Sequence, residues 1–296
     1  MIPEKNKLLE KIILGTVQLG LDYGINNTSG KISDNEIASI LEIAVKNNLL
    51  FLDTAQAYGD SETRLGNYIL NSNQNWKVVT KITKQNIERL TDSVIESCSR
   101  LNLKKLYGIL YHDFLSYKEH PESYSELEKL QNKGVVEKIG FSLYHPEELE
   151  YLFENKVNFN IIQIPYNVFD QRFEKYFEEL YKRNISIHIR SVFLQGLIFS
   201  DTEKLHPFFE GFKSKLEKLN RISTLYDTPK DILCILFALQ NKHISNVVMG
   251  VDNSKQFADN LETTSNYFLT DEIIQSLKEL NETNNNYILP YLWKIK

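Results

Sequence analysis

Cysteine is scarce in this chain of 296 residues. Its two cysteines, Cys98 and Cys234, lie in stretches that we predict to be helical, and they form no CxxC pair and no metal-ligand spacing. This scarcity excludes a disulfide framework and a cysteine-based metal site as the basis of the fold. We expect two free, buried thiols in a protein of a reducing compartment.

Long hydrophobic runs and an excess of positive charge are also missing. No run approaches the roughly 20 apolar residues that span a membrane, and the opening residues, MIPEKNKLLEK, lack the apolar core of a signal peptide. The net charge of -5 gives no electrostatic reason to bind nucleic acid or an anionic membrane. We therefore expect a cytoplasmic protein with neither partner.

Histidine is the third scarce residue type, with 6 copies in the chain. A metal-dependent barrel hydrolase or isomerase needs several histidines and carboxylates that converge as ligands. Most of these histidines do not fall at predicted strand ends, so we predict no metal site. His188 falls within a predicted strand, where we expect a packed histidine with its hydrogen bonds satisfied.

Apolar residues are abundant, and short apolar runs alternate with amphipathic stretches along the chain. Apolar residues make up 42% of the chain, enough for a sizeable core. Short apolar runs predict eight strands, at Lys11–Thr16, Leu49–Asp53, Lys77–Lys81, Leu106–His112, Val136–Phe141, Phe159–Ile164, Ile185–Arg190 and Asn246–Gly250. Eight strand–helix units predict an α/β fold, a closed (β/α)8 TIM barrel, which takes about 250 residues.

Amphipathic stretches follow the strands. They predict helices at Asp34–Lys46, Ser61–Leu70, Asn86–Leu101, Ser123–Asn132, Pro146–Asn155, Phe173–Arg183, Phe209–Leu225, Pro229–Gln240 and Ser254–Thr263. An extra C-terminal helix is predicted at Thr270–Glu282, ended by the asparagines at 284–286 and followed by a short tail, Tyr287–Lys296. No linker composition interrupts residues 1–296, so we expect a single domain, with the connection Phe193–Pro207 as its most mobile segment.

Chemically active side chains occur where several predicted strands end. Asp53 ends the second strand and Tyr58 lies on the loop beyond it, while Lys81 ends the third strand and His112 the fourth. In such barrels, the carboxyl ends of the strands carry the catalytic groups. Each residue alone has another explanation: a helix cap, one of 16 tyrosines, a solvated charge or a turn histidine.

Taken together, these residues carry a family resemblance. The stretch Asp53-Thr54-Ala55 with Tyr58-Gly59 and Ser61-Glu62 resembles the signature of the aldo-keto reductases. Further fragments fall in the family's order along nearly the whole chain: GTVQLG at 15–20, Lys81, His112, GFS at 140–142, QIPYN at 163–167 and RSVFLQG at 190–196.

The resemblance implies an NAD(P)H-dependent oxidoreductase that reduces an aldehyde or ketone, since the chain itself holds no hydride donor. It implies that Tyr58 donates the proton and that Lys81 lowers the Tyr58 pKa. Asp53 would hold Lys81 in an ion pair, and His112 would bind the substrate oxygen.

The resemblance also implies a cofactor site. Ser142 and Gln163 would bind the nicotinamide carboxamide, and Arg190 would stack on the nicotinamide ring. The full set of implied cofactor residues is Thr16, Asp53, Ser142, Gln163, Arg190, Ser191, Leu194, Gly196, Gly250, Gln256 and Asn260, of which Ser191, Leu194 and Gly196 would line the pyrophosphate and the last three belong to the adenosine end.

Two positions depart from the family pattern. Leu143 follows Ser142 where many relatives have asparagine. Asp252 stands where many relatives carry an arginine for the adenosine 2′-phosphate, leaving Lys255 as the nearby cation. The expected cofactor is NADP(H), with NAD(H) as the alternative, and we expect weak or reversed discrimination against NADH.

The partner and the alternatives follow from the same residues. We expect a small-molecule carbonyl substrate; the polar, asparagine-rich loop Leu21–Lys31, with Tyr23 as a stacking face, favours a sugar-like one. Tyr291 and Trp293 either close part of the pocket or pack the tail onto the barrel. The alternative function is a non-catalytic, cofactor-binding regulatory protein of the same fold, like the potassium-channel beta subunits. The complete set of four catalytic residue types favours an enzyme, and the sequence indicates no oligomeric state.

Overall fold

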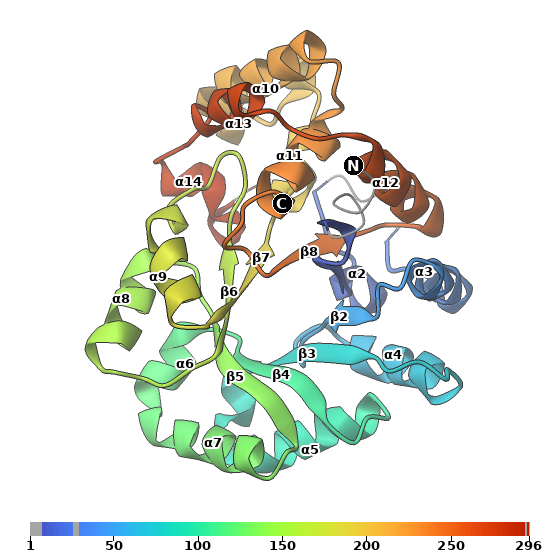
Figure 1. Cartoon of the computed structure of the whole chain (residues 1–296), viewed down its shortest axis with the longest axis vertical. Coiled ribbons are helices and arrows are strands. Elements are labelled where there is room, and N and C mark those ends of the chain that lie inside the picture. The colour runs from blue at the N-terminus through green and yellow to red at the C-terminus, as the bar shows by residue number, and fades with distance from the viewer. Residues whose placement is uncertain (1–7, 26–29, 294, 296) are drawn as a thin grey trace.

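Eight parallel strands close into one barrel in sequence order, β1 to β8 (Figure 1). The structure is a computed structural model, and it describes residues 8–25, 30–293 and 295. The strands are β1 (Ile12–Gly15), β2 (Phe51–Asp53), β3 (Lys77–Ile82), β4 (Leu106–Tyr111), β5 (Val136–Ser142), β6 (Ile161–Pro165), β7 (Ser186–Arg190) and β8 (Asn246–Gly250). The predicted TIM barrel is confirmed, and β1 pairs with β8 to close it.

Helices surround the barrel, as Figure 1 shows. Those at the predicted places are α3 (Asp34–Lys46), α4 (Ser61–Leu70), α5 (Leu90–Arg100), α7 (Tyr124–Asn132), α8 (Pro146–Glu154), α9 (Phe177–Lys182), α10 (Lys213–Leu225), α11 (Lys230–Leu239), α12 (Ser254–Asn266) and α13 (Asp271–Lys278). Three short helices, α2 (Val17–Gly20), α6 (Phe114–Glu119) and α14 (Asn285–Ile288), were not predicted.

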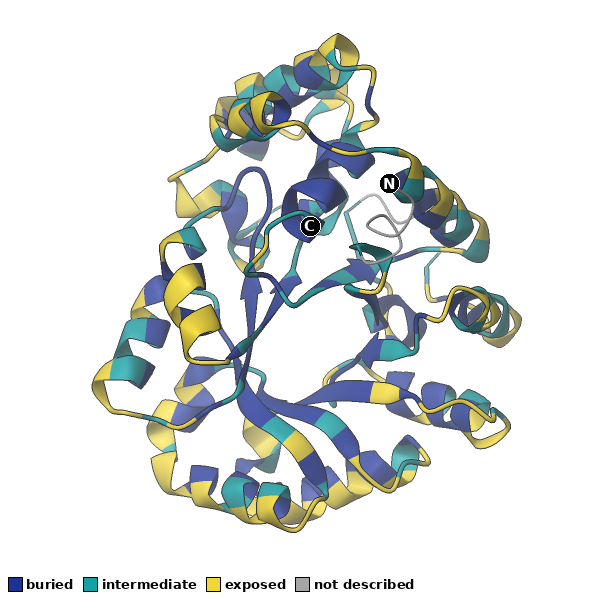
Figure 2. Cartoon of the chain, viewed as in Figure 1, coloured by how far each residue is buried: buried dark blue, intermediate teal, exposed yellow. Residues whose placement is uncertain are grey.

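Helix α3 shows why the sequence patterns fold as they do. Ser33 caps it by accepting a hydrogen bond from the Glu36 amide, and Lys46 lies in its last turn. Its apolar residues share one buried face because they recur at helical spacing: Ile37, Ile40, Leu41 and Ala44. Figure 2 shows the same pattern around the barrel, with exposed residues on the outer faces of the helices.

One prediction about a connection is wrong, and the mobility predicted for a second connection stays a prediction. The asparagines at 284–286 do not end the extra helix: α13 already ends at Lys278, and Asn284 caps α14 instead. Its side chain accepts from the Asn286 amide, which is what a capping asparagine does. The connection Phe193–Pro207 is not structureless, since it contains the 3-10 helices η4 (Leu194–Phe199) and η5 (Thr202–Lys204).

Further 3-10 turns precede or follow the longer helices. They are η1 (Lys84–Arg89), η2 (Pro121–Ser123), η3 (Glu174–Tyr176), η6 (Pro207–Phe212) and η7 (Pro290–Leu292). The first parts of three predicted helices are therefore 3-10 rather than α, namely those predicted at Asn86, Phe173 and Phe209. A 3-10 turn is common at the start of an α-helix. The residues of these three turns do not line the pocket.

The core contains both cysteines as free, buried thiols, as predicted. Within the described part of the chain, no helix is long and apolar enough to cross a membrane. Close packing at Gly20 fixes the loop beyond β2: a Cβ there would lie 1.7 Å from the Tyr58 carbonyl oxygen. Only glycine lets α2 approach that loop, which places Tyr58 at the rim.

Candidate active site

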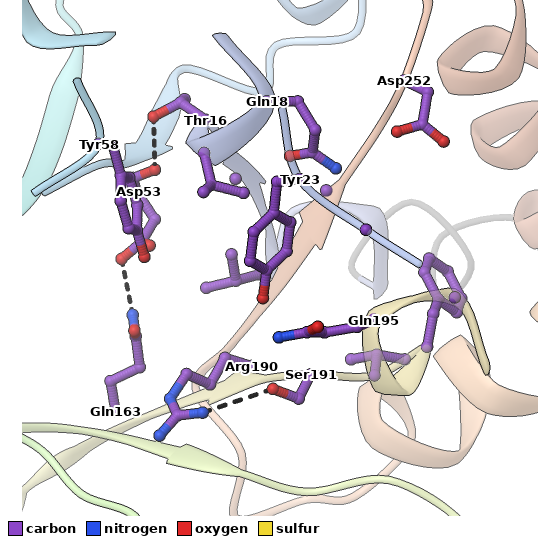
Figure 3. A pocket seen from close by; sticks show the side chains of 18 of the residues that line it. Thr16, Gln18, Tyr23, Asp53, Tyr58, Gln163, Arg190, Ser191, Gln195 and Asp252 are labelled. Atoms are coloured by element: carbon purple, nitrogen blue, oxygen red, sulfur yellow. Dashed lines mark hydrogen bonds between the residues drawn. The ribbon is translucent and has the colours of Figure 1, made fainter. Parts of the chain in front are cut away.

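A pocket of about 200 Å³ opens at the carboxyl ends of the strands (Figure 3). The predicted residues that line it are Thr16, Asp53, Tyr58, Lys81, His112, Ser142, Gln163, Arg190, Ser191, Gly196, Gly250 and Gln256. They come from separate strands and loops and converge because parallel strands end at one rim of a barrel. Leu194 and Asn260 are buried but do not line the pocket.

An ion pair lies at the base of the pocket. The Lys81 Nζ is 2.7 Å from the Asp53 Oδ1 and 2.8 Å from the Thr54 carbonyl oxygen. The Gln163 amide donates to the other oxygen of Asp53 at 2.6 Å. Both charged side chains are almost fully buried, so water screens their attraction little. The pairing that we predicted between Asp53 and Lys81 is present.

Tyr58 lies above this pair on the loop between β2 and α4. The Lys81 Nζ is 5.1 Å from the centroid of the Tyr58 ring. The His112 ring meets the same ring edge-on, with centroids 5.8 Å apart. The loop turns at Gly59, which has a φ of +55°, a conformation that glycine adopts without strain. The four predicted catalytic residues therefore lie together.

The Tyr58 pKa differs from the expectation. Burial raises the pKa of Tyr58 above its ordinary value of 10.0, and the Asp53 carboxylate adds to this effect, while Arg190 opposes it. Burial also lowers the pKa of Lys81, partly offset by Asp53. The lowered Tyr58 pKa that we predicted is therefore not found here, because burial disfavours the phenolate more than the charge of Arg190 favours it.

His112 is neutral in this environment. Burial lowers the pKa of His112 to about 3, and the positive charges of Lys81 and Arg190 contribute to this shift. A neutral imidazole carries one donor and one acceptor nitrogen. His112 can therefore donate a hydrogen bond to a carbonyl oxygen at neutral pH without bringing a second cation into the pocket.

Arg190 lines the pocket and packs against a neighbouring aromatic ring. Its guanidinium carbon lies 4.0 Å from the centroid of the Tyr144 ring, in a cation–π contact. One of its nitrogens donates to the Leu143 carbonyl oxygen at 2.9 Å. One face of the guanidinium is thus covered by Tyr144, which the sequence analysis did not single out. Its stacking on a nicotinamide stays a prediction.

Thr16 links two strands at the pocket. The Thr16 hydroxyl lines the pocket but donates to the Asp53 carbonyl oxygen at 2.9 Å, so it also ties β1 to the end of β2.

His188 is fully buried, between the rings of Phe51 and Tyr107. Neither of its ring nitrogens has a hydrogen-bond partner in the described structure. The prediction of a packed histidine is confirmed, but that of a satisfied one is wrong.

Sequence reasoning missed a bridge over the pocket. The Ile25 amide donates to the Gln195 carbonyl oxygen at 3.2 Å, and Tyr23 makes a hydrogen bond with the Gln195 side chain. Figure 3 shows Tyr23 above Arg190 and near Gln195. Gln195 itself has a φ of +51°, an uncommon value for a residue with a side chain. Only the polarity of the loop after β1 hinted at a rim function.

The tail packs onto the molecule rather than closing the pocket. Tyr291 is 54% exposed, lies against Tyr144 and makes a hydrogen bond with His145. Trp293 meets Phe209 edge-on. Neither Tyr291 nor Trp293 lines the pocket. Of the two explanations left open by the sequence, packing of the tail is the one that the contacts favour.

The pocket suits a dinucleotide better than a metal ion. Among the residues that the structure describes, no group of histidine, cysteine or carboxylate side chains could hold a metal. The pocket extends from Tyr58 to Asp252 and Gln256. The buried Gln18 Oε1 has no partner in the described structure, and a Cβ on Gly250 would come within 3.0 Å of the same amide group. The pocket therefore has an open acceptor that a ligand could use, on a Gln18 amide that packs closely against Gly250.

One class of oxidoreductase is defined by four residues at the carboxyl rim of a parallel barrel: a lysine–aspartate pair, a tyrosine and a histidine. The model of the Aldo/keto reductase family matches residues 11–282. The chain belongs to this family and is an oxidoreductase of it, and NAD(P)H-dependent reduction is typical of the family.

Relatives agree with this assignment. The chain is 25% identical to an uncharacterized oxidoreductase, YqkF, of Bacillus subtilis (strain 168), over 91% of this chain and 96% of that one. Its fold is similar to the aldo-keto reductase AKR11C1 from Bacillus halodurans (TM-score 0.75, 19% identity, 91% of each chain). It is also similar to the glycerol dehydrogenase AKR11B4 from Gluconobacter oxydans (TM-score 0.73, 19% identity, 97% of this chain and 94% of that one).

Proposed function

We propose that this enzyme reduces a polar aldehyde or ketone with NAD(P)H and that Tyr58 donates the proton to the carbonyl oxygen. The observation that carries the proposal is the convergence of Tyr58, Lys81, Asp53 and His112 at one end of a single pocket. The bound cofactor would supply the hydride. The other tasks fall to residues of this chain.

The raised pKa of Tyr58 suits a proton donor. Because burial and Asp53 raise this pKa, the phenol is protonated near neutral pH and holds a proton to give. After the transfer, the phenolate would be stabilised by the two cations in its neighbourhood, the ammonium of Lys81 and the guanidinium of Arg190. Asp53 would keep Lys81 in place, and neutral His112 would orient the substrate oxygen.

The cofactor would occupy the length of the pocket. Ser142 and Gln163 line it beside the catalytic residues, and Ser191 and Gly196 line it along the loop after β7. Gly196 has a φ of +90°, which suits a close approach of backbone to a pyrophosphate. Gly250 and Gln256 would hold the adenosine end, with Leu194 and Asn260 supporting from beneath rather than touching it.

The substrate side of the pocket is polar. Tyr23, Tyr144 and Gln195 line it near Arg190, and all four side chains can form hydrogen bonds. Such a lining favours a hydroxylated substrate, such as a sugar derivative or a small polyol-related carbonyl, over a steroid. The Gluconobacter oxydans relative is named as a dehydrogenase of glycerol, a polyol, which is in line with this proposal. We also propose a cytoplasmic location, where reduced nicotinamide cofactors are available.

A panel of carbonyl compounds tests the proposal. Purified enzyme is mixed with NADH or NADPH and with sugars, hydroxyaldehydes, hydroxyketones and apolar ketones, and oxidation of the cofactor is followed by absorbance. We expect substrate-dependent oxidation that is fastest with the hydroxylated compounds. A preference for apolar ketones would contradict the polar substrate class. Cofactor binding without turnover of any carbonyl would favour the regulatory alternative.

A further inference from the structure

An arginine outside the pocket connects three segments of the chain. Arg172 lies between β6 and η3, and its guanidinium donates to both carboxylate oxygens of Asp170, at 2.8 Å each. The Asp170 side chain is fully buried, and that of Arg172 is 16% exposed. A two-pronged contact of this kind fixes the plane of a guanidinium as well as its position. Asp170 therefore sets the direction in which the other donors of Arg172 point.

These donors reach two other parts of the chain. One nitrogen of Arg172 donates to the Tyr144 carbonyl oxygen at 3.2 Å, in the loop after β5, and another donates to the Asn285 side chain at 3.3 Å, at the start of α14. The Tyr144 amide is held as well, because it donates to the Glu148 carboxylate at 2.7 Å. The backbone of Tyr144 is thus held by Arg172 at its carbonyl group and by Glu148 at its amide group.

Tyr144 is the residue through which this arrangement meets the pocket. Its ring centroid lies 4.0 Å from the guanidinium carbon of Arg190, and the preceding residue, Leu143, has the carbonyl oxygen that accepts from Arg190 at 2.9 Å. A third contact of Arg190, with the Ser191 hydroxyl, is longer at 3.4 Å. Arg172 itself does not line the pocket, so it acts on the pocket through the segment 143–144.

The position of Arg190 matters for the proposed proton donor. Its guanidinium lies among the pocket side chains in Figure 3, and its positive charge lowers the pKa of Tyr58 against the raising effects of burial and Asp53. The other cation, Lys81, is paired with Asp53 at 2.7 Å. A displaced Arg190 would therefore remove a stabilising charge from the phenolate that forms when Tyr58 gives up its proton.

We propose that Arg172 is a positioning residue for the reaction: it holds the segment 143–144 in the place from which that segment keeps the Arg190 guanidinium in the pocket. The inference rests on the proposed function, because it takes Tyr58 as the proton donor that Arg190 assists. It deepens that function because it names a residue outside the pocket on which the rate of the reaction depends.

The test is a double-mutant cycle on the rate of a single turnover with the best carbonyl of the panel. Arg172→Lys keeps a cation beside Asp170 but lacks the planar fork that also reaches Tyr144. We expect this variant to oxidise its bound reduced cofactor about tenfold more slowly than the wild type, because a pocket group is displaced. In the Arg190→Met background, the same substitution should change the rate less than about twofold, because the residue that Arg172 positions is absent.

A second variant loosens the same segment without leaving a buried charge unpaired. Glu148 is partly buried in the first turn of α8, and Glu148→Ala removes the acceptor of the Tyr144 amide. We expect it to slow the single turnover as Arg172→Lys does, and again only while Arg190 is present.

The matched control is an arginine with similar contacts elsewhere. Arg183 pairs with the Glu179 carboxylate and lies against the ring of Phe153, but it does not line the pocket. We expect Arg183→Lys to turn over at the wild-type rate in both backgrounds.

A measurement without turnover follows the guanidinium directly. The Nε–H signal of Arg190 can be identified in nitrogen–proton NMR correlation spectra by its loss in Arg190→Met. Because the Tyr144 ring lies against this guanidinium, we expect the signal to move in Arg172→Lys and Glu148→Ala. It should stay in place in Arg183→Lys.

An equal loss of rate with and without Arg190 would show that Arg172 acts on stability alone, and it would overturn the inference. So would a wild-type rate in Arg190→Met, wild-type rates in both Arg172→Lys and Glu148→Ala, or an Arg190 signal that moves in neither of them. A wild type that turns over no carbonyl would contradict the proposed function instead. The Arg190 signal would then still decide whether Arg172 positions this guanidinium.

Discussion

Lys81 and Asp53 show how burial shapes the chemistry of single residues. Both side chains are at least 96% buried, and each has the other as its charged partner, at 2.7 Å. Removal of one partner would leave an uncompensated charge where water cannot reach it. The same two residues position Tyr58 and Gln163, so a change at either should affect stability and activity together.

We therefore expect Asp53→Asn and Lys81→Ala each to lower the free energy of unfolding by about 3–5 kcal/mol and to remove most activity. Denaturant unfolding and steady-state kinetics measure the two effects. The exposed pair of Lys84 with Glu119 provides the control, and Lys84→Ala should change neither quantity appreciably. Full activity in Lys81→Ala would contradict the role given to the pair.

At the scale of elements, the loop that carries Tyr58 depends on helix α2. Gly20 ends α2, and a side chain there would overlap the Tyr58 carbonyl oxygen. The loop after β1 then crosses the pocket to Gln195 on η4. Two short elements with little core of their own thus hold one wall of the site, which makes the site sensitive to a single methyl group at Gly20.

Gly20→Ala should push α2 away from the Tyr58 loop, cost about 1–3 kcal/mol of stability and reduce activity. Thermal unfolding and kinetics on the same samples measure this. Gly134→Ala is the comparison: it has open space around it but a φ of +73°, so it should cost stability through backbone strain without loss of activity. Equal activity in the two variants would show that the Tyr58 loop does not depend on α2.

The sequence predicted those elements whose signal is local. The barrel strands and the residues at their ends could be predicted because apolar runs and polar strand ends are visible in sequence. The bridge from Ile25 to Gln195 could not, because it joins segments far apart in the chain through backbone groups that carry no residue signature. The contact between Arg172 and the Tyr144 carbonyl oxygen was missed for the same reason. The stacking of Arg190 on Tyr144 depends on side-chain conformation, which spacing does not determine.

At the scale of the whole molecule, two histidines are held neutral, His188 inside the barrel and the partly buried His112 at the pocket. Burial lowers the pKa of both His112 and His188 to about 3, from an ordinary value of 6.5. The unfolded chain therefore binds more protons than the folded one between about pH 6.5 and pH 3. The free energy of unfolding is therefore highest above the histidine pKa of the unfolded chain. It decreases as the pH falls from there towards the lower pKa that each histidine has in the folded protein.

The melting temperature should consequently fall as the pH is lowered from 7 to 5, with each histidine costing on the order of 1 kcal/mol per pH unit below about 6.5. Differential scanning calorimetry across this range measures the slope. His188→Leu removes one of the two groups without touching the pocket, so its slope should be about half as steep. A melting temperature of the wild type that does not change between pH 7 and 5 would show that the two histidines are not held neutral.

The most direct test of the proposed chemistry is a single-turnover comparison of wild type with Tyr58→Phe, each loaded with its reduced cofactor and mixed with the best carbonyl of the panel. Removal of a positioned general acid typically costs about a hundredfold or more in rate. We predict that Tyr58→Phe binds the cofactor as the wild type does and oxidises it at least about a hundredfold more slowly. Turnover at the wild-type rate in Tyr58→Phe would contradict the assignment of Tyr58 as proton donor.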